Sequence, residues 1–251
     1  MKFKVLEAFK NSIVFYRENL ENILLIYFPF FIANFIISIL FKIDQLFLIY
    51  STLEYLLVLL IMSIFIYPFQ KTTIYLYFYN KDVKKAYLES LKYYPGILLI
   101  VLFNVFSYLM LTALSVFLST FISSTIFILT NNFELFFYSY FISFTILTLI
   151  FYVIINKFFI SSPLYMFEKK KIVQSLRESW NIIDIKNSFK IYILQLLLYS
   201  LAIVILVAQQ IYYKELFIFK LIDIFTSVYI IIPITNIFSL YLYEQYKNYS
   251  K

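Results

Sequence analysis

The sequence predicts an all-α, polytopic membrane protein with about six transmembrane helices. Of its 251 residues, 63% are hydrophobic and 14% are charged, whereas soluble domains average about 45–50% apolar and about 25% charged residues. The apolar residues form several long runs, each close to the roughly 20 residues that a helix needs to cross a bilayer. Because these runs are continuously apolar and hydrocarbon offers the backbone no hydrogen-bond partner, we expect helices and not strands.

Six membrane-spanning helices are expected within a single membrane domain of residues 1–251. Their approximate ranges are 23–41, 46–69, 97–119, 135–155, 191–208 and 221–243. Apolar sequence continues beyond the third range to Thr130, so that helix either is longer or is followed by a segment along the outer interface.

Three basic, amphipathic segments precede successive pairs of these helices. In each, a small residue and a bulky residue stand four and three positions before a serine, and a bulky residue follows it: Ala8, Phe9, Ser12 and Ile13; Ala86, Tyr87, Ser90 and Leu91; Ser175, Leu176, Ser179 and Trp180. In the third segment, Val173, Leu176, Trp180 and Ile183 are expected to form the apolar face. A proline near the end of each pair, at Pro68, Pro163 and Pro233, completes the pattern.

The pattern indicates three divergent repeat units, at about 1–80, 81–168 and 169–251, each an amphipathic surface helix followed by a transmembrane hairpin. The alternative is that loops of membrane proteins from AT-rich genomes share this composition without repeating.

The distribution of basic residues predicts the orientation. Eighteen Lys and Arg residues lie before the first helix, after the second, after the fourth and after the sixth, and three lie on the other side. Because positively charged loops stay in the cytoplasm, we expect a cell-membrane protein with both termini cytoplasmic. The net charge of +7 then reflects orientation, and no nucleic-acid partner is expected.

The absence of His and Cys and the single glycine restrict the chemistry. No imidazole or thiolate can ligate zinc or an iron–sulfur cluster, and neither can act as general base or nucleophile. A glycine-rich phosphate loop needs at least two glycines. We therefore expect no cofactor and no enzymatic activity.

Three polar residues form a candidate intramembrane polar site. Glu54 falls within the second predicted span, and an acid there is by default a functional hypothesis, although a position near the outer interface is the alternative. Asn104 and Gln195 lie early in the third and fifth spans. For these two, hydrogen bonds between helices, worth about 0.6–2 kcal/mol each, are favoured over a ligand role.

Serines recur every four residues in the third and fourth predicted spans. They are Ser115, Ser119 and Ser123 in the first case and Ser139 and Ser143 in the second. Small residues at this spacing allow helices to approach closely, so we expect these two faces to pack together.

Basic residues of the second and third surface segments are candidate contacts for anionic lipids at the cytoplasmic face. They are Lys84, Lys85, Lys169, Lys170, Lys171 and Arg177. Each such residue near an anionic surface contributes about 1 kcal/mol. Trp180 is expected to anchor its helix at the interface.

The stretch from Pro163 into the fifth span resembles a recurring motif of a six-helix membrane family. The matching residues are Pro163, Glu168, Ser175, Leu176, Ser179 and Trp180. The motif is similar to one in the membrane domain that precedes some glycerophosphodiester phosphodiesterases, and to one in YciC-like uncharacterised integral membrane proteins. The resemblance implies a six-helix membrane module that faces the cytoplasm. It does not imply phosphodiesterase activity, which belongs to a separate soluble barrel with catalytic histidines.

The sequence therefore predicts a non-enzymatic module that acts at the cytoplasmic face through lipid contacts, or through contacts with a protein partner or a second copy of itself. The alternative is a small transporter or channel, which the repeats and proline-interrupted helices favour. An intramembrane enzyme ranks last, because no constellation of catalytic residues is present.

Overall fold

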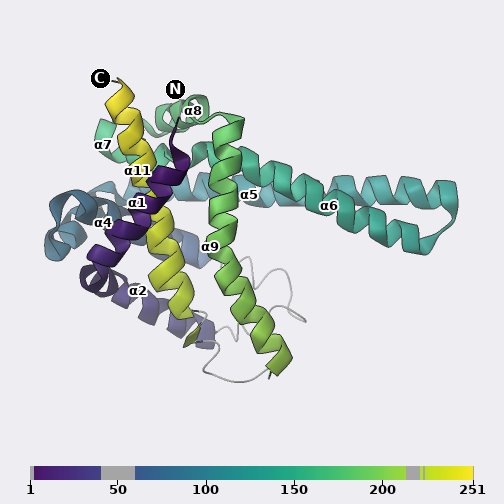
Figure 1. The fold of residues 1–251 in the computed structure, drawn as a ribbon, viewed down its shortest axis with the longest axis horizontal. Coiled ribbons are helices and arrows are strands. Elements are labelled where there is room, and N and C mark those ends of the chain that lie inside the picture. Colours follow the sequence, from purple (N-terminus) through teal and green to yellow (C-terminus); the bar gives the residue numbers. More distant parts are fainter. Residues whose placement is uncertain (1–2, 41–59, 213–220, 223, 251) are drawn as a thin grey trace.

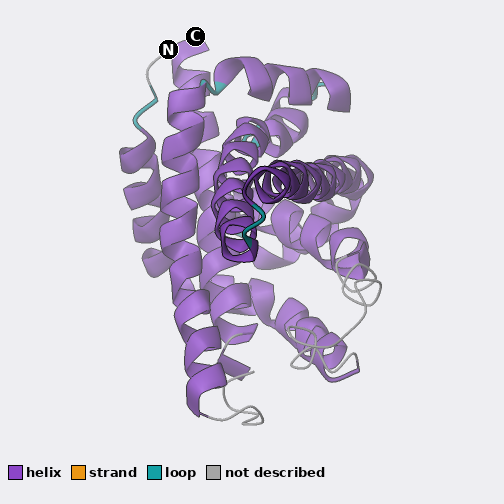
Figure 2. Cartoon of the chain, turned by 90° about the vertical axis from the view of Figure 1, so that its right-hand side faces the viewer, coloured by secondary structure: helices purple, strands orange, loops and turns teal. Residues whose placement is uncertain are grey.

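The structure is a computed structural model that describes residues 3–40, 60–212, 221–222 and 224–250. Helices connected by short turns account for these residues, and no strand occurs among them (Figures 1 and 2). Four described segments are helical, long and apolar enough to cross a membrane: Leu20–Ile37, Val83–Thr130, Phe133–Glu168 and Thr226–Tyr249. They overlap the first, third, fourth and sixth predicted spans. The predicted helical class is thus confirmed for the described residues.

The N-terminal unit begins with two helices that meet at Asn19. These are α1 (Val5–Glu18) and α2 (Leu20–Leu40). The Asn19 backbone N–H and side-chain amide both donate to the Phe15 carbonyl, at 3.1 Å and 2.9 Å. The side-chain oxygen of Asn19, Oδ1, accepts a hydrogen bond from the Tyr77 hydroxyl (3.0 Å). Because these bonds satisfy the end of α1, the chain can turn between its surface helix and α2.

Two proline-containing helices follow π-helical turns. The turn η2 (Met62–Ile66) leads into α4 (Tyr67–Asn80), and the turn η4 (Thr226–Ile231) leads into α11 (Ile232–Ser250). Pro68 and Pro233 each occupy the second position of their helix. Proline is tolerated in a first turn, where its missing N–H would have no α-helical acceptor. The hydroxyls of Tyr75 in α4 and Ser239 in α11 lie 2.6 Å apart and join the two helices.

A long hairpin arm, formed by α5 (Val83–Thr130) and α6 (Phe133–Ile155), extends sideways from the bundle (Figure 1). Of the two alternatives for the sequence after residue 119, the structure shows the longer helix, because α5 continues to Thr130. The surface segment expected before this span is continuous with it in one helix of 48 residues. Its apolar sequence continues to Thr130, and the helix passes through Pro95 without a break. Asn131 ends α5 in a left-handed conformation (φ 48°), and Asn132 caps α6.

The predicted packing of the serine faces is confirmed in the arm. Ser115, Ser119 and Ser123 are fully buried in α5, which packs along α6. On α6, Ser139 and Ser143 are half-buried and donate to backbone carbonyls of their own helix. Small side chains thus let the two helices approach closely while large apolar side chains face outward.

The remaining helices close one end of the molecule. A short 3₁₀ turn, η3 (Asn156–Phe158), separates α6 from α7 (Ser161–Glu168), which α8 (Ile172–Ile182) and α9 (Ile185–Tyr212) follow. Figure 1 places α7, α8 and both chain ends at this end, which we call the terminal surface. The arm runs across the direction of α9 and α11 in both views (Figures 1 and 2).

Small residues are buried at the fourth and eighth positions of α1, α5 and α8. The pairs are Ala8 and Ser12, Ala86 and Ser90, and Ser175 and Ser179, all fully buried. Each of the three helices that carry these pairs packs on a neighbouring helix: α1 packs on α11, α5 packs on α4, and α8 packs on α7. Of the residues predicted to form the apolar face of α8, Ile183 is buried and Leu176 is half-buried, whereas Val173 and Trp180 are exposed. Serines allow a closer approach than those side chains, so the serine face is the buried one.

Candidate functional site

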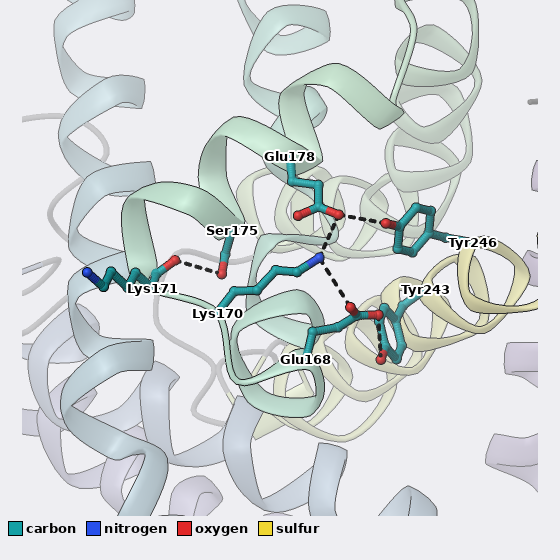
Figure 3. A network of polar contacts seen from close by, with 7 residues as sticks. All are labelled: Glu168, Lys170, Lys171, Ser175, Glu178, Tyr243 and Tyr246. Carbon is teal, nitrogen blue, oxygen red and sulfur yellow. Dashed lines mark hydrogen bonds and ion pairs between the residues drawn. The ribbon is translucent and has the colours of Figure 1, made fainter. Parts of the chain in front are cut away.

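Three consecutive lysines, residues 169–171, connect α7 to α8 at the terminal surface (Figure 1). Lys169 ends α7 in a left-handed conformation (φ 51°), which redirects the chain. Lys171 precedes the first residue of α8, and its carbonyl accepts hydrogen bonds from the backbone N–H and the hydroxyl of Ser175 (2.9 Å and 3.1 Å). From this turn the side chains of Lys170 and Lys171 point in different directions (Figure 3).

Lys170 points between two carboxylates (Figure 3). Its Nζ lies 3.1 Å from Glu168 Oε2 and 2.6 Å from Glu178 Oε1. The Tyr243 hydroxyl donates to Glu168 (3.3 Å) and the Tyr246 hydroxyl donates to Glu178 (2.6 Å), both from α11. The three charged side chains are mostly buried: Lys170 is 19% exposed, Glu168 is 25% exposed and Glu178 is 23% exposed. This network fixes the α7–α8 turn against the last helix.

The network also determines the charge states of its members. Burial alone raises the pKa of the Glu178 carboxyl, but hydrogen bonds from Lys170 and Tyr246 outweigh burial and hold that pKa below its ordinary value. Burial lowers the pKa of the Lys170 ammonium, but its hydrogen bonds to Glu178 and Glu168 outweigh burial and raise that pKa above its ordinary value. Both groups are therefore charged at neutral pH.

Four consecutive side chains near the end of α11, residues 243–246, bind four different elements. The two tyrosines bind the carboxylates of α7 and α8, as described above. Glu244 accepts a hydrogen bond from the Tyr79 hydroxyl of α4. Gln245 exchanges two hydrogen bonds with the backbone of Lys4, just before α1, at 3.0 Å and 3.2 Å. The end of α11 therefore joins the N-terminal segment, α4, α7 and α8.

Five of the six cations predicted to contact lipid are exposed. Lys169, Lys171 and Arg177 flank the network, and Lys84 and Lys85 lie in the first turn of α5. The Lys85 ammonium is 3.9 Å from Glu89 in an exposed pair, and such pairs are weak. The sixth cation, Lys170, differs from the others because its ammonium is held in two ion pairs.

Two residues of the predicted intramembrane polar site, Asn104 and Gln195, lie among the described residues. Glu54 lies outside them. The Asn104 side-chain oxygen is buried without a hydrogen-bond partner on α5, and Gln195 is half-buried on α9. No hydrogen bond joins these two residues.

Sequence reasoning missed Glu178, Tyr243 and Tyr246 as members of a site. The available signal was the aromatic and acidic sequence LYLYEQYK near the C-terminus, which repeats the aromatic sequence after Pro68. Its partners could not be named, because the contacts with Glu168 and Glu178 span 75 and 68 residues.

The arrangement positions charged groups and tyrosine hydroxyls around Lys170. No group of three or more His, Cys, Asp or Glu residues able to hold a metal ion occurs in the described part of the chain. Comparisons with protein-family models, curated proteins and solved structures find no match. In the described part of the chain, fold and site thus define a helical protein with several helices able to cross a membrane and with exposed cations around two carboxylates that share one lysine.

Proposed function

We propose that this chain is a non-enzymatic, multi-pass module of the cell membrane that binds anionic lipids through its cytoplasmic surface. The observation that carries the proposal is the α7–α8 turn. Its two acids bind Lys170 internally, while Lys169, Lys171 and Arg177 remain exposed. At about 1 kcal/mol for each cation near an anionic leaflet, these three residues contribute about 3 kcal/mol.

Six transmembrane helices in three repeat units are part of the proposal. Support comes from the buried small residues at equivalent positions of α1, α5 and α8, and from the prolines that follow π-helical turns before α4 and α11. The helices α5 and α8 each pack on the proline-containing helix that precedes them, α4 and α7, and α1 packs on α11, the last such helix. In this arrangement the three units form a closed ring, with the first unit beside the third.

Topology is tested with single cysteines, which a chain without native cysteine accepts cleanly. Cysteines in place of Asn11, Asn80 and Gln174 are expected to be shielded from a membrane-impermeant thiol reagent in intact cells. A cysteine in place of Thr130, at the end of α5, is expected to be labelled. All four positions are exposed in the structure, so reaction after permeabilisation is the control. Labelling of the first three positions in intact cells contradicts the proposed orientation.

Lipid binding is tested with the triple variant Lys169→Gln/Lys171→Gln/Arg177→Gln in nanodiscs of mixed lipids. Native mass spectrometry is expected to show that retention of anionic lipid falls roughly tenfold or more relative to the unmodified protein, because three cations are lost. The matched control Lys169→Arg/Lys171→Arg/Arg177→Lys preserves charge and is expected to retain lipid. Equal retention by the glutamine and control variants contradicts the proposal. The same spectra report any protein partner or second copy.

A small transporter remains a second candidate, which one observation favours. Gln70 is fully buried in α4, and neither polar atom of its amide has a hydrogen-bond partner. It lies two residues after Pro68 and its π-helical turn, and unwound, proline-interrupted helices build many transport sites. Solute or ion flux through reconstituted protein that is abolished by Gln70→Leu, with stability preserved, would favour transport over lipid binding.

The relation to the six-helix membrane family stays a prediction based on its motif. The motif residues lie in α7 and α8, on both sides of the α7–α8 turn. Glu168 binds Lys170, and Ser175 and Ser179 form the buried face of α8. These contacts give the motif a structural role that is independent of any soluble catalytic domain.

A further inference from the structure

Lys157 and Trp180 form a cation–aromatic pair where α6 ends beside α8. The Lys157 Nζ lies 4.1 Å from the centroid of the Trp180 ring, within the range of an attractive interaction. The ring also packs on Phe158, with centroids 5.3 Å apart. The Ser179 hydroxyl donates to the Lys157 carbonyl (2.8 Å), which attaches η3 to α8. The pair is therefore fixed before any ligand arrives.

Both members of the pair retain unused hydrogen-bond donors. Among the described residues, the Lys157 ammonium has no ion pair and the Trp180 indole N–H has no acceptor. An ammonium has three N–H donors, and stacking on a ring supplies no acceptor for them. Trp180 is 37% exposed, so the pair is reachable from outside. A ligand with several acceptor oxygens and negative charge would satisfy both groups.

The surroundings favour an anion. Arg177 lies three residues before Trp180, on an adjoining part of the α8 surface, and is exposed. The nearest acids in sequence are occupied elsewhere. Glu178 binds Lys170 and Tyr246, and Asp184 accepts the Asn187 backbone N–H at the start of α9 (2.7 Å).

The location favours a lipid. Lys157 lies in the segment Phe133–Glu168, which is long and apolar enough to cross a membrane. Lysine and tryptophan at the end of such a helix lie at the level of the lipid headgroups. We propose that Lys157, Trp180 and Arg177 bind the phosphodiester group of an anionic phospholipid in the cytoplasmic leaflet. This site rests on the membrane orientation in the proposed function, but it adds Lys157 and a defined geometry.

The experiment uses Trp180 as its own probe, because it is the chain's single tryptophan. The full chain is reconstituted into phosphatidylcholine vesicles that contain either brominated phosphatidylglycerol or brominated phosphatidylcholine. Quenching of tryptophan emission then reports which lipid lies beside the ring. At equal mole fraction we expect the anionic lipid to associate about fivefold more strongly than the zwitterionic one. Lys157→Gln is expected to abolish that preference, and Lys157→Arg is expected to preserve it.

Control variants separate this site from the proposed lipid-binding surface. Lys186→Gln removes an exposed cation at the start of α9 and is expected to leave the preference intact. Lys169→Gln/Lys171→Gln is expected to reduce total anionic-lipid retention without changing the preference at Trp180. If this double variant retains all its lipid while Lys157→Gln loses the preference, the site stands and the broader proposal fails.

Three results would overturn the site. The first is equal quenching by both brominated lipids in the unmodified protein. The second is an unchanged preference in Lys157→Gln, with its fold verified by circular dichroism of that same variant. The third is a shift of Trp180 emission by inorganic phosphate in vesicles of phosphatidylcholine alone, which would assign the site to a free anion and not to a lipid.

Discussion

Lys170→Met is expected to destabilise the protein by about 2 kcal/mol. The substitution leaves Glu168 and Glu178 without the ammonium that lies 3.1 Å and 2.6 Å from their carboxylates. Removing one partner of a buried ion pair costs about 3–5 kcal/mol, because it leaves an uncompensated charge, and partial exposure of these side chains reduces that cost. Thermal unfolding in detergent, followed by circular dichroism, measures the loss.

The matched variant is Glu178→Gln, which preserves the shape of the side chain and leaves Lys170 paired with Glu168. The loss of stability in Glu178→Gln is expected to be smaller than in Lys170→Met, because no charge is left unpaired. A loss in Lys170→Met equal to or below that of Glu178→Gln would contradict the assigned role of the lysine.

The pH dependence of this network has a defined sign. Because the folded-state pKa of Glu178 is below its ordinary value, its stabilisation is present at neutral pH and is lost as the pH falls through that folded-state value. The pKa of Lys170 is raised, so its stabilisation is lost as the pH rises through the folded-state pKa. The difference between the unmodified protein and Lys170→Met is therefore expected to be largest at neutral pH. A difference independent of pH would contradict the ion-pair assignment.

The helical architecture could be predicted because long apolar runs permit few other structures. Each run must satisfy its own backbone within the membrane, and the helices Leu20–Ile37 and Thr226–Tyr249 match that expectation. The shared face of the serines could also be predicted, because residues four apart lie on the same face of a helix whatever surrounds it.

The details that escaped prediction depend on what lies opposite each helix. In α8 the apolar pattern indicated an amphipathic helix but not which residues its neighbours would cover: Val173 and Trp180 are exposed, and Ser175 and Ser179 are buried. The continuity of the second surface segment with the third span also escaped prediction, although a longer helix to Thr130 was expected as one alternative. A proline followed by a glycine, as at Pro95, is typical of a turn. At Gly96 a Cβ would lie 2.0 Å from the Tyr165 ring, so the glycine provides space for α7 and does not break α5.

Replacing Ser115, Ser119 and Ser123 together by leucine is expected to separate α5 from α6 and to destabilise the arm by about 1–3 kcal/mol for each site. All three residues are fully buried in the interface between the helices. Leucine places three carbon atoms where serine has one hydroxyl oxygen, and little space can accommodate them where the backbones approach closely. A spin label at Ile128 of α5 and another at Tyr138 of α6, both exposed, report the separation as a longer and broader distance distribution.

The matched control is the triple serine-to-alanine variant, which distinguishes size from polarity. The hydroxyls of Ser119 and Ser123 have no hydrogen-bond partner, and that of Ser115 bonds only to Leu111 of its own helix (3.0 Å). Removing them should thus cost no bond between the helices, and the alanine variant is expected to keep the separation and stability of the unmodified protein. If alanine destabilises the arm as much as leucine does, the hydroxyls are required, and a polar path along the hairpin becomes the better explanation. If the leucine variant is unchanged, close packing of the serine faces is not what joins the arm.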